Sequence, residues 1–125
     1  MGTVYRLEHV GIGAQRDKYE ETVRFYETVF GWRRMREQPG ILTFVGDDTG
    51  GRFEIFATEK APLRAPHHVA FAVPLDDFQR VTEALTAAGA TLDEPFINDF
   101  GDHIQYFTDP AENRAQIVGR IAPLE

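Results

Sequence analysis

Two short segments of similar pattern each carry a histidine, and they lie about half the chain apart. The segment EHVGIG (8–13) contains His9, and the segment HHVAFAV (67–73) contains His68. Neutral imidazole is a common ligand of divalent metals. Because the equivalent halves of a duplicated fold can meet at a shared cleft, the two histidines predict a metal site between the halves.

A carboxylate and an amide occupy a second pair of matched positions. Glu54 lies in the segment RFEIF and Gln116 in RAQIV, and a turn of Asp, Gly or Asn residues precedes each segment. Glu54 stands between bulky apolar residues, where a carboxylate without a partner is costly. Carboxylate and amide oxygens are both competent metal ligands. The four candidate ligands are therefore His9, Glu54, His68 and Gln116.

The chemistry of this ligand set leaves several metals open. The chain has no cysteine, so thiolate ligation is excluded, and one divalent ion of Zn, Ni, Mn, Fe or Co fits the remaining donors. A dication with one carboxylate ligand keeps about one unit of positive charge, which suits an anionic, oxygen-rich substrate. Glu54 is the only candidate for a catalytic base. Arg114 shares a strand face with Gln116, where it either holds a substrate anion or forms a salt bridge across the sheet.

The elements that must position these residues also occur twice. In the first half we expect a strand at 4–14, a helix that opens with a capping box at Asp17 and ends at Gly31, and strands near 32–37, 41–46 and 52–58. In the second half we expect a strand at 67–73, a helix after Pro74, and strands near 90–97, 102–108 and 114–119. The sequence therefore predicts one α+β domain over 1–125, built from two βαβββ repeats at about 1–60 and 66–122.

Composition narrows the class of partner. The chain has 125 residues, a formal charge of −7 and 42% hydrophobic residues, which suits a single compact domain. The acidic balance argues against nucleic acid and against an anionic membrane surface. The sequence contains no apolar run long enough for a membrane span or a signal peptide, so we expect a cytoplasmic protein that binds a small molecule.

The order and spacing of the repeated segments resemble the vicinal oxygen chelate superfamily, which includes glyoxalase I, bleomycin-resistance proteins and extradiol dioxygenases. The resemblance covers nearly the whole chain and rests on the segments 7–12, 25–32, 52–56, 68–73 and 109–113. It implies a U-shaped, eight-stranded mixed sheet around a central cleft, a homodimer, and metal ligands at His9, Glu54, His68 and Gln116. Gln116 departs from the glyoxalase type, in which most metal-dependent members have a proton-shuttling Glu at this position.

The resemblance leaves two functions to separate. The first is a metal-dependent isomerase, lyase or dioxygenase that chelates two adjacent oxygens of a small substrate. The second is a metal-free protein of the bleomycin-resistance kind that sequesters an apolar or planar ligand. In either case we expect aromatic side chains to line the cleft, namely Trp32, Phe44, Phe56 and Tyr106. Removal of metal by a chelator separates the two, because only the first function requires the ion.

Overall fold

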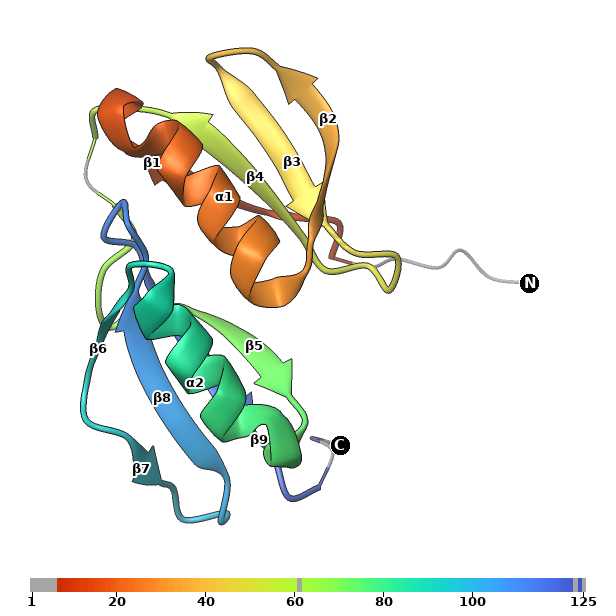
Figure 1. Ribbon diagram of the computed structural model, residues 1–125, viewed down its shortest axis with the longest axis vertical. Helices are drawn as coiled ribbons and strands as arrows, with labels where there is room; N and C mark the ends of the chain where they lie inside the picture. The colour runs from red at the N-terminus through yellow and green to blue at the C-terminus, as the bar shows by residue number, and fades with distance from the viewer. Residues whose placement is uncertain (1–6, 61, 123, 125) are drawn as a thin grey trace.

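The computed structural model describes residues 7–60, 62–122 and 124, which form two modules of similar build (Figure 1). The first module contains β1 (Val10–Ala14), α1 (Tyr19–Phe30), β2 (Arg33–Gln38), β3 (Leu42–Gly46) and β4 (Arg52–Ala57). The second contains β5 (Val69–Val73), α2 (Phe78–Ala87), β6 (Thr91–Leu92), β7 (Phe96–Ile97), β8 (His103–Thr108) and β9 (Arg114–Gly119). The predicted α+β architecture of two βαβββ modules is confirmed. No helix in these described ranges has the length and apolarity needed to cross a membrane.

Both modules pair their strands in the same way. The first sheet has the order β1-β4-β3-β2, and the second has the order β5-β9-β8-β6 with β7 also on β8. In each sheet the first strand runs parallel to the last and the other pairs are antiparallel, so the sheets are mixed. Among the described residues, no strand of the first sheet pairs with a strand of the second. One edge of β1 and one edge of β5 therefore have no strand partner.

Local chemistry explains where the elements differ from the sequence-based expectation. The strand expected near 90–97 is interrupted between β6 and β7, because Pro95 lies there and cannot donate a ladder hydrogen bond. The prediction of a capping box at Asp17 is wrong. A short 3-10 turn, Arg16–Lys18, precedes α1, and no side chain caps the N-terminus of that helix. The exit from α1 is as expected, since Gly31 has a φ of 67°.

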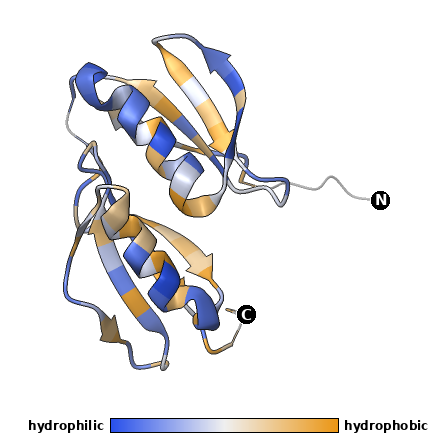
Figure 2. Cartoon of the chain, in the orientation of Figure 1, coloured by the Kyte–Doolittle hydropathy of each residue, from blue (hydrophilic) through white to orange (hydrophobic). Residues whose placement is uncertain are grey.

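The helices cover one face of the sheets, and aromatic side chains join the modules there. Phe30 at the end of α1 stacks on Phe71 of β5, with ring centroids 4.3 Å apart. Phe25 of α1 likewise lies 6.0 Å from Phe107 of β8. Hydrophilic and hydrophobic positions alternate along both helices, as expected for helices with one buried face, and β3 and β5 are largely apolar (Figure 2). One continuous core therefore spans the two repeats.

A buried polar cluster of Tyr26, Asp109 and Asn113 also joins the modules. The Tyr26 hydroxyl donates to Asp109 Oδ2 at 2.7 Å, and Asn113 Nδ2 donates to the Gly13 carbonyl at 2.8 Å. Burial raises the pKa of the Asp109 carboxyl, although hydrogen bonds from Tyr26 and Asn113 oppose that rise. Burial, and then the charge of Asp109, raise the pKa of Tyr26 well above its ordinary value. This inter-module polar cluster fixes α1 and β1 against the turn before β9.

Candidate functional site

His9 and Glu54 come together on the sheet face opposite the helices. His9 directly precedes β1, and Glu54 in β4 lies opposite Gly11 in the parallel ladder. His9 Nε2 is 4.0 Å from Glu54 Oε1, and both side chains are half-buried. A Cβ atom at Gly11 would lie 3.5 Å from that same carboxylate oxygen, so glycine keeps the space beside Glu54 open. We call His9 and Glu54 half-site 1.

The hydrogen bond made by the other ring nitrogen of His9 sets the tautomer. His9 Nδ1 lies 2.8 Å from Glu8 Oε1, and a carboxylate can only accept, so Nδ1 carries the proton. In the neutral ring this leaves the lone pair on Nε2, the atom that faces Glu54. Metal-binding histidines in proteins almost always donate their second ring nitrogen in this way.

His68 repeats the arrangement in the second module. Its Nδ1 donates to the Pro66 carbonyl at 3.0 Å, which again leaves the lone pair on Nε2. Gln116, in the middle of β9, is 7% exposed and pairs in the ladder with Ala70 and Tyr106. Ala70 corresponds to Gly11, so both modules have a small residue beside the second candidate ligand. We call His68 and Gln116 half-site 2.

An aromatic ring packs edge-on against each imidazole. The ring centroids of Phe44 and His9 are 5.2 Å apart at an interplanar angle of 88°. Those of Tyr106 and His68 are 5.3 Å apart at 81°. These rings restrict the orientation of both imidazoles. The equivalence of the two repeats, inferred from the sequence, thus extends to the surroundings of each histidine.

The two half-sites do not merge within one chain. Over residues 7–60, 62–122 and 124, no three His, Asp or Glu side chains lie together as a group able to hold a metal ion. The structure therefore brings His9 to Glu54 and places His68 and Gln116 on one sheet face, but it does not gather His9, Glu54 and His68 in one place. Imidazole, carboxylate and amide donors of this kind suit a divalent ion chemically. Each half-site alone contains two of the four candidate ligands.

The predicted substrate-binding residues lie in different surroundings. Arg114 forms a salt bridge to Asp93 at 3.0 Å and covers the Tyr106 ring at 4.2 Å, so the salt-bridge alternative describes its present contact. Phe56 lies on the same strand face as Glu54 and contacts the space beside Gly11. Trp32 instead lies on the helix side of the first sheet, where its ring centroid is 5.4 Å from that of Phe53.

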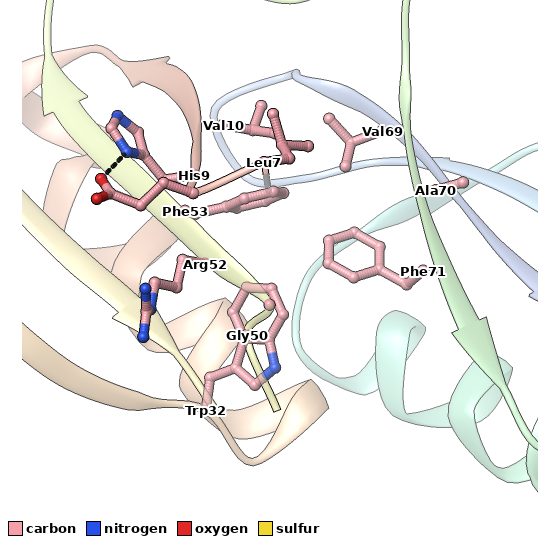
Figure 3. A pocket seen from close by; sticks show the side chains of 12 residues that line it. Leu7, His9, Val10, Trp32, Gly50, Arg52, Phe53, Val69, Ala70 and Phe71 are labelled. Atoms are coloured by element: carbon pink, nitrogen blue, oxygen red, sulfur yellow. Dashed lines mark hydrogen bonds and ion pairs between the residues drawn. The ribbon is translucent and has the colours of Figure 1, made fainter. Parts of the chain in front are cut away.

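Trp32 belongs to a pocket of about 200 Å³ between the first sheet and β5 (Figure 3). Apolar side chains make up most of its wall, namely Leu7, Val10, Trp32, Phe53, Val69 and Phe71. Its polar rim contains Glu8, His9 and Arg52. The pocket therefore opens beside half-site 1, and we call it the inter-module pocket.

Sequence reasoning missed the groups that orient the imidazoles. Neighbouring side chains in a strand point to opposite faces, so an alternating strand pattern gives no sign of a contact between Glu8 and His9. The contact forms because both residues precede the first residue of β1. The contribution of Pro66 is a backbone carbonyl, which carries no signal in the identity of the residue.

Comparison with known proteins agrees with this architecture. A family model described as the Glyoxalase/Bleomycin resistance protein/Dioxygenase superfamily matches residues 6–117. None of the curated proteins compared with the chain matched it.

Solved structures of similar fold include two fosfomycin resistance proteins named FosX. The one from Mesorhizobium loti is 21% identical with a TM-score of 0.78, and the match covers 94% of each chain. The one from Listeria monocytogenes, complexed with Mn(II) and 1S,2S-dihydroxypropylphosphonic acid, is 17% identical with a TM-score of 0.81 and covers 95% of this chain and 94% of that one. A lactoylglutathione lyase from Agrobacterium tumefaciens is 17% identical with a TM-score of 0.69, covering 94% and 96%. At these identities the likeness establishes the fold.

Proposed function

We propose, since the chain belongs to the glyoxalase/bleomycin resistance protein/dioxygenase superfamily, that it is a divalent-metal-dependent enzyme acting on adjacent oxygens of a small substrate. The carrying observation is that His9 and His68 both have Nδ1 engaged as a donor, which leaves Nε2 of each ring free to ligate. Glu54 and Gln116 provide the oxygen donors. One half-site alone provides too few ligands, so the proposal joins both.

Half-site 1 of one copy and half-site 2 of a second copy would complete the coordination sphere in a homodimer. Within one chain the candidate ligands do not form a single group among the described residues. The unpaired edges of β1 and β5 are surfaces on which a second copy can pack. A two-fold dimer would then contain two such sites, because each chain contributes both halves.

The roles of the residues follow from their chemistry. A bound divalent ion would polarise the substrate oxygens as a Lewis acid. Glu54 is the one carboxylate among the four ligands, so it is the group that can take a proton from the substrate. The Gln116 amide can bind the ion but cannot accept a proton at neutral pH. Half-site 2 therefore provides no second base. An isomerase, a lyase or a dioxygenase remains compatible with this set, and a cytoplasmic location stays our expectation from composition.

Metal analysis tests this proposal. The purified protein should bind one ion of Zn, Ni, Mn, Fe or Co per chain after dialysis, as measured by elemental mass spectrometry. His9→Ala and His68→Ala should each lower the bound metal severely. His67→Ala is the matched change, because that neighbouring imidazole is exposed and lies outside both half-sites. Binding that survives both ligand changes would refute the proposal.

The inter-module pocket favours a second candidate, a metal-free binding protein of the bleomycin-resistance type. Its apolar wall can hold a ligand without any ion. Exhaustive chelation separates the candidates. Catalysis by the first function stops when the metal is removed, whereas sequestration by the second continues.

A further inference from the structure

We propose that Arg52 selects a substrate with an anionic group beside its two chelating oxygens, by binding that group next to half-site 1. This substrate class rests on the proposed function and adds the residue that recognises it. A carboxylate and a phosphate both fit the planar fork of a guanidinium, so the anionic group is one of these two.

The side chain of Arg52 shares the face of β4 that carries Glu54. The two residues are two positions apart in one strand, so their side chains point to the same side of the sheet. Phe53, between them, points to the opposite side and belongs to the core. In Figure 3 the Arg52 guanidinium points away from the Phe53 and Phe71 rings. Arg52 therefore lies on the face of the metal ligands and outside the apolar wall.

The strand register places Arg52 next to His9. β1 and β4 pair in parallel with Val10 opposite Phe53, so the residues one position earlier, His9 and Arg52, are neighbours. On its other side Arg52 pairs with Gly46 of β3, where a Cβ atom would lie only 3.0 Å from Arg52 Cγ. Glycine at this position keeps the space beside the arginine side chain open.

A metal ion changes the balance of charge around Arg52. Without the ion, the carboxylates of Glu8 and Glu54 outweigh the single guanidinium and would repel another anion. A divalent ion bound at half-site 1 offsets both carboxylates and leaves the charge of Arg52 in excess. The anion site therefore belongs to the metal-loaded protein.

The neighbouring arginines already have acidic partners. Arg33 of β2, on the same face of the first sheet, forms an ion pair with Asp48 at 2.9 Å. Arg114, the equivalent of Arg52 in the second module, pairs with Asp93 at 3.0 Å. Arg52 is exposed and forms no ion pair with an Asp or Glu in the described part of the chain. Its guanidinium is therefore the one available to a substrate.

Ligand titrations of the Mn²⁺-loaded, full-length protein test the assignment. The probes are glycerol, glycerate and glycerol 3-phosphate, which share two adjacent hydroxyl groups and differ in charge. Water-proton relaxation measures binding, because a chelating ligand displaces water from the bound Mn²⁺. We expect at least one of the two acids to bind about tenfold more tightly than glycerol, and the preferred acid identifies the anionic group. No preference for either acid over glycerol would overturn the assignment.

Two variants separate a site on Arg52 from general attraction. Arg52→Met keeps the apolar stem and should bind the preferred acid about fivefold or more weakly, with Mn²⁺ content and glycerol affinity unchanged. Arg80→Met removes a charge that is 69% exposed on α2, on the helix side of the molecule, and should change no affinity. Equal losses in the two variants, or a parallel loss of glycerol affinity in Arg52→Met, would contradict the assignment.

Metal analysis distinguishes the two possible failures. If the wild-type protein binds no divalent ion, the proposed function fails and the anion site on Arg52 fails with it. If Mn²⁺ binds through His9 and His68 but neither acid is preferred to glycerol, the anion site alone fails and the proposed function stands.

Discussion

At the scale of single residues, the tautomers of His9 and His68 support the proposed metal binding more strongly than the mere presence of two histidines does. Their Nδ1 atoms donate to a carboxylate and to a carbonyl, respectively. The sequence could identify both rings from the repeat. It could not identify Glu8 as a partner, because that contact depends on where β1 begins, and boundaries of strands are poorly encoded locally.

Removal of the Glu8 carboxylate tests this reading. Glu8→Ala should weaken divalent metal binding by about tenfold or more, because His9 would lose the acceptor that fixes the orientation of its ring. Glu8 is 71% exposed, so the fold should be unaffected. Titration calorimetry with Zn²⁺ measures the affinity. Glu94→Ala, a change at another exposed glutamate, gives the reference, and an equal affinity for the two variants would contradict the role of Glu8.

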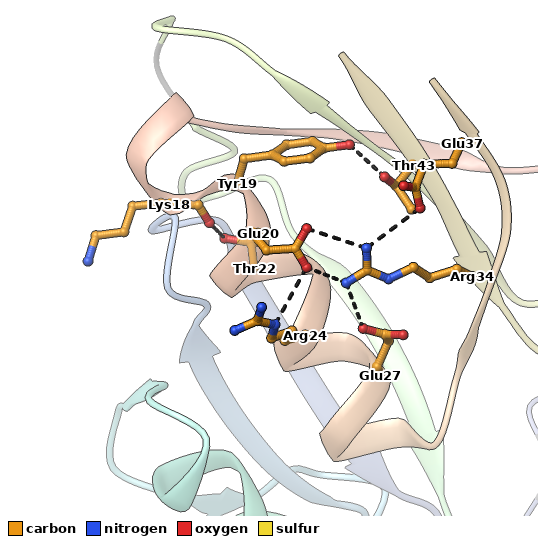
Figure 4. Close-up of polar contacts among 9 residues, drawn as sticks. All are labelled: Lys18, Tyr19, Glu20, Thr22, Arg24, Glu27, Arg34, Glu37 and Thr43. Atoms are coloured by element: carbon orange, nitrogen blue, oxygen red, sulfur yellow. Dashed lines mark hydrogen bonds and ion pairs between the residues drawn. The ribbon is translucent and has the colours of Figure 1, made fainter. Parts of the chain in front are cut away.

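At the scale of elements, an ionic network ties α1 to β2 (Figure 4). Arg34 of β2 forms hydrogen bonds with Glu20 and Glu27 of α1, and it lies 3.5 Å from Glu37. Its hydrogen bond is the main cause that lowers the pKa of Glu20, and the same contacts raise the pKa of Arg34 further. This network is a polar link between α1 and its sheet. No side chain caps the N-terminus of α1.

We expect Arg34→Met to lower the free energy of unfolding by about 1 kcal/mol at neutral pH, since solvent screens the half-exposed carboxylates. The pKa of Glu20 is lowered in the fold, so its contribution is complete above the ordinary value of 4.5 and lost as pH falls below it. The difference between variant and parent should therefore shrink in acid. Urea unfolding at several pH values measures it. A difference that is independent of pH, or an equal loss in Arg36→Met, would contradict the network.

The elements also show how far sequence reasoning extends. Periodicity predicted both helices and the strands that carry Glu54 and Gln116, because each is a long, regular segment. It failed near Pro95, where one expected strand became two short ones, and at Asp17, where a 3-10 turn replaced the cap. Both failures concern turn geometry, which depends on tertiary contacts as well as on local residues.

At the scale of the whole molecule, the polar cluster of Tyr26, Asp109 and Asn113 fixes how the modules meet. The Tyr26–Asp109 hydrogen bond joins positions 83 residues apart. Pairings of this range are not visible in one sequence. The cluster therefore fixes the relative position of the two modules, and with it the separation between the two half-sites of one chain.

Tyr26→Phe should destabilise the protein by about 2 kcal/mol, because it removes a buried donor to the Asp109 carboxyl. Tyr19→Phe is the matched change: that buried hydroxyl contacts Thr43 within the first module, so its loss should cost about 1 kcal/mol. Urea denaturation compares the two. A smaller loss for Tyr26→Phe than for Tyr19→Phe would argue against a charged link between modules.

The central claim is that two copies share each metal site, and mixing two inactive variants tests it most directly. His9→Ala and His68→Ala each destroy every site in their own homodimers. A mixed dimer of the two would keep one intact site, built from the unchanged half of each chain. After co-refolding equal amounts, we predict metal bound at about one quarter of the wild-type level, by elemental mass spectrometry of the dimer fraction. No recovery above either variant alone would contradict the account.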